Sequence, residues 1–397
     1  MATRALLVDI VRSPFGKGRP DGALAGLHPV DLFAQVLRAL IDRVAIDPGE
    51  VEDVIAGCVL QVGEQAANVA RHAWLAAGLP DTTPGVTLDR KCGSGQQALD
   101  FAAQGIIAGA YDVVVAGGVE SMSRVAMKSN RLGQDNLGPA FRHRYSDGLP
   151  HQGLAAERIA AHWRLPREAL DAYASSSHQR AAAATAQGRL ARQIVPVEVA
   201  TPAGSAWVTH DEGIRPGTSL ERLAALAPAF QDAAGARRFP EIDWRVTAGN
   251  SSQVTDGAFA ALLVSEQAAA RLGLVPRAAL THFAVHGDDP LMMLTGILPA
   301  TRRLLARAGV RLEEIGAFEV NEAFASVVLA WLQEFPVAPE RVNALGGAIA
   351  YGHPVGASGG RLLACLLEVL EASRERLGLQ TMCESGGMAN ATLVERL

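Results

Sequence analysis

Apolar positions recur with two different periods along the chain, and these periods predict strands that alternate with helices. Arg4–Val11 and Val54–Val59 are short, nearly continuous apolar runs, which is typical of buried strands. Between them, Pro29–Val44 repeats apolar residues every three or four positions, as on one face of a helix. The next elements are expected as a helix at about Asn68–Ala77, a strand at Val86–Leu88, a helix at about Ser94–Ala108 and a strand at Val113–Ala116. This order predicts an α/β protein with a mostly parallel or mixed sheet covered on both faces.

The C-terminal part of the chain repeats this pattern. R-A-A-L-T-H-F from Arg277 is similar to R-A-L-L-V-D-I from Arg4, and G-A-S-G from Gly356 corresponds to C-G-S-G from Cys92, each at a predicted helix start. S-G-G-M from Ser385 likewise corresponds to A-G-G-V after the strand at Val113–Ala116. The matches keep the same order at a nearly constant offset, which favours an internal duplication over chance likeness between αβ units.

A different kind of sequence separates the two similar parts. Residues 121–244 are polar and punctuated by Arg, Gly and Pro, with one clear helix predicted at about Pro166–Gly188. Insertions of this length usually cover or shape a site. We therefore expect an N-terminal half at 1–120 that is completed by about 245–266, an inserted loop domain at 121–244 and a C-terminal half at 267–397.

Composition excludes several classes of protein. The 397 residues are 49% hydrophobic and 19% charged, enough for a large core and unlike a disordered chain. The net charge of −5 argues against a general nucleic-acid binder. Four cysteines without a C-x-x-C pair suit neither a disulfide framework nor a zinc site. No apolar run approaches 18 residues and no targeting segment is evident, so we expect a cytoplasmic protein without a membrane partner.

Two residues with chemical potential lie on predicted helix-opening loops. Cys92 stands in D-R-K-C-G-S-G, where the positive end of a helix dipole favours a thiolate. Its plain alternative is a small buried hydrophobe. His353 precedes a proline, so it is not helical, and six glycines lie around it between Asn343 and Gly360. A glycine-rich loop can present an imidazole to a ligand, although the ring could equally serve a turn.

Two further candidates follow predicted strands. Cys383 precedes a glycine turn, so its thiol is expected at a sheet edge, unless it only packs. Asn321 follows the strand at Ala317–Val320, where its amide can hold a water or a carbonyl, or cap the next helix. Two thiols, an imidazole and an amide suit covalent acyl transfer: a thiolate attacks a thioester, the imidazole activates it and amide donors stabilise the oxyanion. A Cys–His protease uses the same first two groups but leaves the second cysteine and the duplication without a role.

These motifs together resemble the thiolases along nearly the whole chain. The matching blocks are K-C-G-S-G at Cys92, N-E-A-F at Asn321, G-H-P-V-G-A-S-G at Gly352, and T-A-G-N-S-S at Thr247 followed by D-G-A at Asp256. Ketoacyl synthases share the fold but use Cys-His-His, so Cys383 and Asn321 favour thiolases. The resemblance implies a thiolase-like α/β fold: two duplicated α/β halves with layered helices and sheets, plus an inserted loop domain.

The resemblance also implies roles. Cys92 would carry the acyl group, His353 would help deprotonate Cys92 or the incoming coenzyme A, and Cys383 would be the acid and base at the α-carbon. Asn321 would hold a water that forms one oxyanion hole with His353, and the N–H groups of Cys92 and Ser385 would form the other. Coenzyme A would lie near His151, Arg215, Phe230, Ala248 and Ser252, and Met293 and Phe324 would line the acyl pocket. Phe230 and Met293 could instead be ordinary core, and Arg215 a solvated arginine.

One departure from the family concerns Ser385, which stands where a glycine is common; its amide N–H survives if the backbone tolerates a Cβ. C-E-x-G-G-x-A-N is closer to degradative 3-ketoacyl-CoA thiolases than to biosynthetic acetoacetyl-CoA ones. The expected reaction is thiolytic cleavage of a 3-oxoacyl-CoA to acyl-CoA and acetyl-CoA through an acyl-cysteine, with coenzyme A as substrate and no metal or redox cofactor. The alternatives are acetoacetyl-CoA synthesis and a non-catalytic CoA-binding or scaffold protein of the same fold. The chain is expected to form a homodimer or a homotetramer, and in a tetramer the Ser123–Pro150 loop would pair the dimers.

Overall fold

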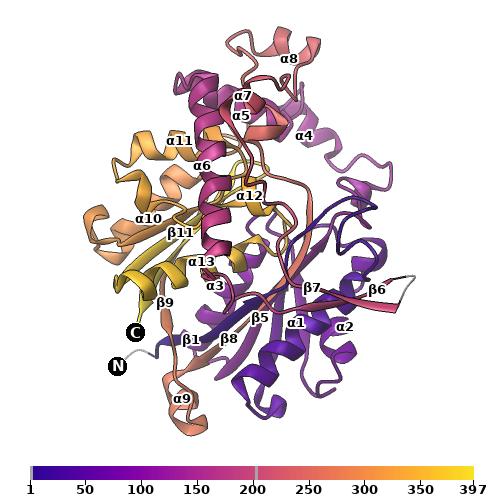
Figure 1. Ribbon diagram of the computed structural model, residues 1–397, viewed down its shortest axis with the longest axis vertical. Helices are drawn as coiled ribbons and strands as arrows, with labels where there is room; N and C mark the ends of the chain where they lie inside the picture. Colours follow the sequence, from indigo (N-terminus) through magenta and orange to yellow (C-terminus); the bar gives the residue numbers. More distant parts are fainter. Residues whose placement is uncertain (1–2, 202–203) are drawn as a thin grey trace.

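One ten-stranded sheet runs through both halves of the molecule in the computed structural model, which describes residues 3–201 and 204–397. Its strands lie in the order β10 (Ala317–Val320), β11 (Leu377–Glu384), β12 (Met388–Arg396), β9 (Ala278–Gly287), β1 (Ala5–Arg12), β8 (Thr255–Ser265), β5 (Val113–Ser121), β3 (Asp53–Gly57) and β4 (Gly85–Leu88), and β2 (Gly16–Lys17) pairs with β8. The halves meet where β1 pairs with β9, through Ala5–Leu7 and Ala278–Leu280. Figure 1 shows the two halves as the indigo-to-purple and orange-to-yellow parts of the ribbon.

Helices form three layers around the two arms of this sheet. α3 (Ser94–Ile107) and α13 (Ser358–Ser373) lie in the middle, where their buried side chains share a core with strands from both halves. α1 (Pro29–Val44) and α2 (Val69–Ala76) pack on the outer face of the N-terminal half. α10 (Ile297–Ala308) and α11 (Ala325–Glu334) pack on the outer face of the C-terminal half (Figure 1).

The predicted elements of the first half are present with small shifts at their ends. The helix predicted at Pro29–Val44 is α1, which begins at a proline and buries one apolar stripe that includes Phe33 and Leu37. β5 runs on to Ser121, beyond the predicted apolar run, because all nine of its residues are buried between β3 and β8.

The inserted segment holds more helices than the single one predicted. α6 (Arg167–Ala186) matches that prediction, and α4 (Gly138–Arg144), α5 (Gln152–His162), α7 (Leu220–Ala224) and α8 (Ala233–Arg238) accompany it. A separate hairpin joins β6 (Val197–Thr201) to β7 (Gly204–Val208). The remaining short helices are α9 (Glu266–Leu272) and α12 (Ala348–Tyr351). Figure 1 shows α5, α7 and α8 at one end of the molecule, whereas α6 runs from that end toward the middle.

Glycines allow the two central helices to begin against each other. A Cβ on Gly95 would lie 2.7 Å from the Gly356 carbonyl oxygen, and one on Gly359 would lie 2.1 Å from the Gln96 nitrogen. Both distances are shorter than side chains tolerate, so glycine is required at each position. The close approach brings together the loops that open α3 and α13, which carry Cys92 and His353.

Among the described residues, no helix combines the length and the apolar content needed to cross a bilayer.

Candidate active site

The Cys92 thiol lies in a small apolar pocket between the two halves. Its side chain is 4% exposed and packs with Val59, Met122 and Met382. Burial, together with the nearby carboxyl of Glu384, raises the pKa of Cys92 to about 12. The N–H of Ser385 donates a hydrogen bond to the thiol, which lowers this pKa but does not offset the burial. The expectation that the helix start favours a thiolate is therefore wrong for the resting chain, because desolvation outweighs the helix dipole. A thiol that keeps its proton needs a base to become a nucleophile.

His353 is held through both its backbone and its ring. Its N–H lies 3.0 Å from the Gln253 carbonyl oxygen and 3.0 Å from the Thr255 hydroxyl. Nδ1 of the ring lies 2.5 Å from Ser358 Oγ, at the first residue of α13. Burial and the positive charge of Arg361 lower the pKa of His353 to about 3. The imidazole is thus neutral near pH 7 and can accept a proton.

Asn321 faces His353 from the end of β10. Its Nδ2 lies 3.5 Å from His353 Nε2, and its backbone N–H donates to the Thr381 carbonyl of β11. Its Oδ1 is buried and has no hydrogen-bond partner among the described residues. The helix that follows, α11, has Phe324 at its N-cap, so the alternative that Asn321 caps this helix is wrong. A buried polar atom without a partner suits a bound water or a substrate oxygen.

Cys383 lies inside a strand, which corrects its expected place at a sheet edge. It pairs with Ala389 across the β11–β12 ladder, and β11 itself lies between β10 and β12. β11 ends at Glu384, so Cys383 is the second-last residue of the strand. Its thiol is fully buried. Burial and the nearby Cys92 raise the pKa of the Cys383 thiol well above its usual range. Two protonated thiols and a neutral imidazole therefore share this site.

Ser385 opens the turn between β11 and β12 without backbone strain. The left-handed conformations of this turn fall on Gly386 (φ +94°) and Gly387 (φ +79°), whereas Ser385 is not among the described residues with positive φ. A Cβ is therefore tolerated where the family often has glycine. The Ser385 N–H is also the backbone donor that contacts the Cys92 thiol.

Aromatic rings connect the inserted segment with the expected acyl pocket. Phe230 lies 5.7 Å from the His151 ring and 5.9 Å from the Phe324 ring, measured between centroids. His151 caps α5 by accepting a hydrogen bond from the Leu154 N–H. Phe324 shares a buried core with Met293, and Phe230 packs against that core. The structure thus brings together four of the residues that the sequence assigned to coenzyme A and the acyl group.

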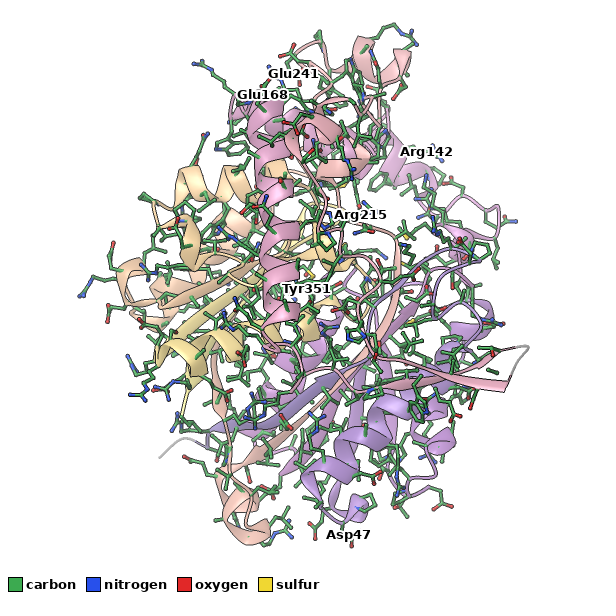
Figure 2. All side chains as sticks on the ribbon, in the orientation of Figure 1. Asp47, Arg142, Glu168, Arg215, Glu241 and Tyr351 are labelled. Atoms are coloured by element: carbon green, nitrogen blue, oxygen red, sulfur yellow. The ribbon has the colours of Figure 1, made fainter. Side chains whose placement is uncertain are left out.

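The other expected coenzyme A residues lie along one strip that leads to His353. Arg215 is exposed and donates to Gln253 Oε1 at 3.0 Å, and Gln253 in turn holds the backbone of His353. The N–H of Ser252 donates to the Ala323 carbonyl, next to Phe324. Ala248 is exposed on the short helix that precedes Ser252. Figure 2 shows Arg215 where the inserted segment meets the two halves.

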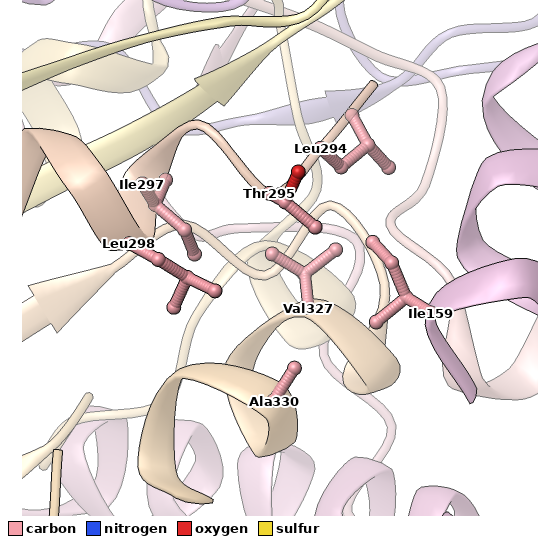
Figure 3. Close-up of a pocket in the computed structure, with 7 residues that line it drawn as sticks. All are labelled: Ile159, Leu294, Thr295, Ile297, Leu298, Val327 and Ala330. Carbon is pink, nitrogen blue, oxygen red and sulfur yellow. The ribbon is translucent and has the colours of Figure 1, made fainter. Parts of the chain in front are cut away.

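A small apolar gap lies in the same hydrophobic core as Met293 and Phe324 (Figure 3). Side chains from α5, α10, α11 and the loop before α10 line this gap, which has no room for a water molecule. They are Ile159, Leu294, Thr295, Ile297, Leu298, Val327 and Ala330. The lining is hydrocarbon apart from the hydroxyl of Thr295.

Three residues that shape this site were missed as functional from the sequence. Ser358 contacts the imidazole, Arg361 lowers the pKa of His353, and Glu384 raises that of Cys92. Both carboxylate oxygens of Glu384 lack partners among the described residues, and burial raises its pKa to about 8. Only Ser358 gave a signal, as a hydroxyl at a predicted helix start; charged residues are usually exposed, so nothing marked the other two.

Comparisons with known proteins agree along the whole chain. A family model described as "Thiolase, N-terminal domain" matches residues 5–267, and one described as "Thiolase, C-terminal domain" matches residues 274–396. Steroid 3-ketoacyl-CoA thiolase FadA6 of Mycobacterium tuberculosis is 47% identical over 403 residues, covering 100% of this chain and 95% of that one. A 3-ketoacyl-CoA thiolase of Bacillus subtilis is 40% identical over 400 residues, covering 98% and 99%.

A solved structure supports the same fold. The crystal structure of the Bacillus anthracis acetyl-CoA acetyltransferase superimposes with a TM-score of 0.89 at 36% identity. The alignment covers 100% of this chain and 99% of that one. The expected fold class, with two α/β halves and an inserted segment, is thereby confirmed.

Proposed function

The chain belongs to the thiolase family, and we propose that it uses coenzyme A to cleave 3-oxoacyl-CoA thioesters into acetyl-CoA and a shorter acyl-CoA. Curated relatives with 40% and 47% identity are named 3-ketoacyl-CoA thiolases, which supports thiolysis in degradative fatty acid metabolism. The observation that carries the proposal is the convergence of Cys92, His353 and Cys383 between the two halves. A non-catalytic scaffold protein has no need of three such groups buried together.

In the first half-reaction, Sγ of Cys92 attacks the 3-oxo carbon while its proton moves to Nε2 of His353. The bond between C2 and C3 then breaks, its electron pair stays on C2, and the Cys383 thiol donates a proton there to give acetyl-CoA. The shorter acyl group remains on Cys92 as a thioester. The N–H groups of Cys92 and Ser385 stabilise the oxyanion at the acyl carbon. His353, together with a water held by Asn321, stabilises the second oxyanion, which is the enolate oxygen of the departing acetyl-CoA.

In the second half-reaction, the thiol of coenzyme A attacks acyl-Cys92 and releases the new acyl-CoA. The proton of this thiol replaces the one that Cys383 gave up, and His353 returns its proton to Cys92. Because the pKa of Cys92 is raised to about 12 and that of His353 is lowered to about 3, the resting pair is neutral. Proton transfer therefore accompanies the attack on the carbonyl instead of preceding it.

Every step of this scheme transfers either a proton or an acyl group, so we propose that no metal or redox cofactor takes part. Coenzyme A enters as a substrate past His151 and Phe230 and along the strip of Arg215, Ala248 and Ser252, with Arg215 toward its nucleotide end. Met293 and Phe324 line the pocket for the acyl group. The exposed position of Arg215 and the apolar core that holds Met293 and Phe324 support this direction of binding.

We further propose that the enzyme is a cytoplasmic homodimer or homotetramer. β4 lies at the end of the sheet order, so one of its edges is unpaired among the described strands, and its Val86 is 45% exposed. α3, which follows β4 through the Cys92 loop, exposes Phe101 and Ile107. The loop Ser123–Pro150 exposes Met127, Leu132 and Leu137, which supports a second contact between dimers. Sedimentation that gives a monomer at micromolar concentration would contradict this proposal.

Intact-protein mass spectrometry tests the proposed chemistry. Incubation with acetyl-CoA should add about 42 Da to the wild-type chain and to Cys365→Ala, a buried cysteine outside the site, but nothing to Cys92→Ala. Acetylation that maps to Cys383 would overturn the assigned roles, and no acetylation at all would favour the scaffold alternative. Thiolysis rates on straight-chain and polycyclic 3-oxoacyl-CoA substrates, compared with the rate of acetoacetyl-CoA formation, then give the preferred substrate and direction.

A further inference from the structure

The ring of His353 has a different neighbour at each nitrogen. Nδ1 lies 2.5 Å from Ser358 Oγ, and that same oxygen lies 2.9 Å from the Pro354 carbonyl oxygen. On the other side, Nε2 lies 3.5 Å from Asn321 Nδ2. Ser358 is fully buried, so no bulk water competes for these contacts.

The hydrogens in this chain of contacts fit one tautomer of the neutral imidazole. The Pro354 carbonyl can only accept, so the hydroxyl hydrogen of Ser358 points to it, and Ser358 Oγ is left to accept from an Nδ1–H. The amide nitrogen of Asn321 can only donate, so Nε2 opposite it carries the lone pair. Each hydrogen then has an acceptor, and the basic nitrogen is the one on the Asn321 side.

The backbone contacts of His353 end at its N–H, so the ring is oriented by its own contacts with Ser358 and Asn321. Gln253 and Thr255 hold that N–H, and Gly352 (φ +103°) brings the chain so close that a Cβ there would lie 2.1 Å from Thr255 Oγ1. These backbone contacts fix the main chain but do not orient the ring, whose contact with Asn321 is long at 3.5 Å. The shorter hydrogen bond to Ser358 holds the ring in its orientation.

We propose that Ser358 is a positioning residue that keeps the proton of neutral His353 on Nδ1, so that Nε2 stays free to take the Cys92 proton. This inference rests on the proposed function, in which His353 is the base. Without the hydroxyl, a buried Nδ1–H would lack an acceptor. The proton would then move to Nε2, where Asn321 Oδ1, which has no partner among the described residues, accepts it once the amide turns. In that state the base is blocked.

The first test reads the tautomer directly and needs no activity. Nitrogen NMR of protein labelled in the imidazole rings distinguishes Nδ1–H from Nε2–H, and the signals missing from His353→Gln identify the ring. The wild-type chain should show Nδ1–H, and Ser358→Ala should shift the population toward Nε2–H. An unchanged Nδ1–H tautomer in Ser358→Ala, or an Nε2–H tautomer in the wild-type chain, would overturn the proposal.

The second test measures the kinetic cost. Ser358→Ala should lower kcat for thiolysis by ~10²-fold or more, because a wrongly placed imidazole proton disables a general base, while KM for coenzyme A changes less than about threefold. Ser358→Thr keeps the hydroxyl and should recover most of the loss. The matched control is Ser326→Ala, another buried hydroxyl in the first turn of a helix, whose Oγ donates to the Ala156 carbonyl; it should stay near wild type.

A folding defect is distinguishable from the proposed effect. If Ser358→Ala does not fold, Ser358→Cys and Ser358→Thr give the comparison, since sulfur is a weak acceptor and a hydroxyl is a good one. Thr above Cys in kcat supports the proposal, and Cys equal to or above Thr overturns it. If wild-type Cys92 fails to acetylate, the proposed function falls, and the NMR result alone then decides the role of Ser358.

Discussion

The loops that open α3 and α13 occupy corresponding places in the two halves, yet they hold their reactive side chains in different ways. Each helix begins with a buried serine. Ser94 Oγ accepts from the Arg90 N–H at 2.8 Å and donates to the Lys91 carbonyl at 2.6 Å, so it ties its own loop together. Ser358 Oγ likewise donates to a carbonyl of its own loop, that of Pro354, but its other contact is the His353 ring. The same residue at the same helix position thus braces only backbone in one half, and backbone together with a side chain in the other.

The difference follows from what each reactive group requires. A thiol has one reactive atom and no tautomers, so a rigid loop and a backbone donor are sufficient to present Cys92. An imidazole has two nitrogens whose roles must be kept apart, and this needs a partner for the ring itself. Burial disfavours the charged form of both groups, so each loop delivers a neutral reactant.

The largest effect should come from the thiol that belongs to neither loop. Cys383→Ser should lose thiolysis by several orders of magnitude, because carbon–carbon cleavage needs its proton, while Cys92 still forms acetyl-enzyme and exchanges acetyl groups between coenzyme A molecules. Both reactions should be measured on this one variant. A parallel fall would give Cys383 a part in both steps, and no fall would leave the Cys92 and His353 loops sufficient by themselves.

The next effect distinguishes the two loops. His353→Ala should slow acetylation of Cys92 by ~10²–10⁴-fold, since it removes the base but keeps the nucleophile. Rapid mixing with acetyl-CoA followed by mass spectrometry gives the rate. Because a thiol with a pKa of about 12 is mostly protonated, higher pH should partly restore the variant. A wild-type rate at neutral pH would mean that another group accepts the proton.

A smaller effect concerns the carboxyl behind the Cys92 loop. Burial raises the pKa of Glu384 to about 8, so the group is neutral below that pH, and its negative charge above that pH is one of the causes that raise the pKa of Cys92. Acetylation by the wild-type chain should therefore fall severalfold relative to Glu384→Gln as the pH rises from about 7 to about 9. Parallel pH profiles for the two proteins would contradict this.

The same carboxyl links pH to folding. Its pKa is higher in the folded chain than in the unfolded chain, so the folded chain binds this proton more tightly. Its stabilising contribution is complete below the unfolded pKa of about 4.3 and is lost as the pH rises through about 8. Denaturant midpoints across that window should fall less for Glu384→Gln than for the wild-type chain.

The smallest expected effect concerns Ser94, which corresponds to Ser358 in the other half. Ser94→Ala should lower the free energy of unfolding by about 1 kcal/mol, because two hydrogen bonds within the loop are lost. It should leave the tautomer of His353 as in the wild-type chain. Thermal unfolding and ring NMR measure the two quantities on one sample. A change of the His353 tautomer in Ser94→Ala would mean that the Cys92 loop and the His353 loop are coupled, which would contradict their independent hydrogen-bonding.

The sequence was most informative where one local pattern decides the structure. The apolar stripe of α1 predicted its exact bounds, Pro29–Val44, and the motifs around Cys92, Asn321 and His353 predicted residues that the fold brings together. The duplication suggested why the two helix-opening loops meet. The division at 1–120, 121–244 and 267–397 stays a prediction.

Other features depend on tertiary contacts that a local pattern does not contain. The interior position of Cys383 depends on β11 lying between β10 and β12. The raised pKa of Cys92 depends on burial and on Glu384, and α5 is buried largely by its packing against α11 of the C-terminal half. The hydrogen bond of Ser358 to a ring five residues earlier depends on the turn between them.

The place of β1 in the sheet has a consequence for how the protein is made. β1 pairs with β8 and β9, which begin at Thr255 and Ala278, so this first strand has no partner until the inserted segment has been synthesised. At about 5–20 residues per second, that leaves the apolar strand unpaired for roughly 13 to 50 seconds after it is polymerised. The nascent chain therefore leaves this apolar segment without its sheet partners for most of its translation.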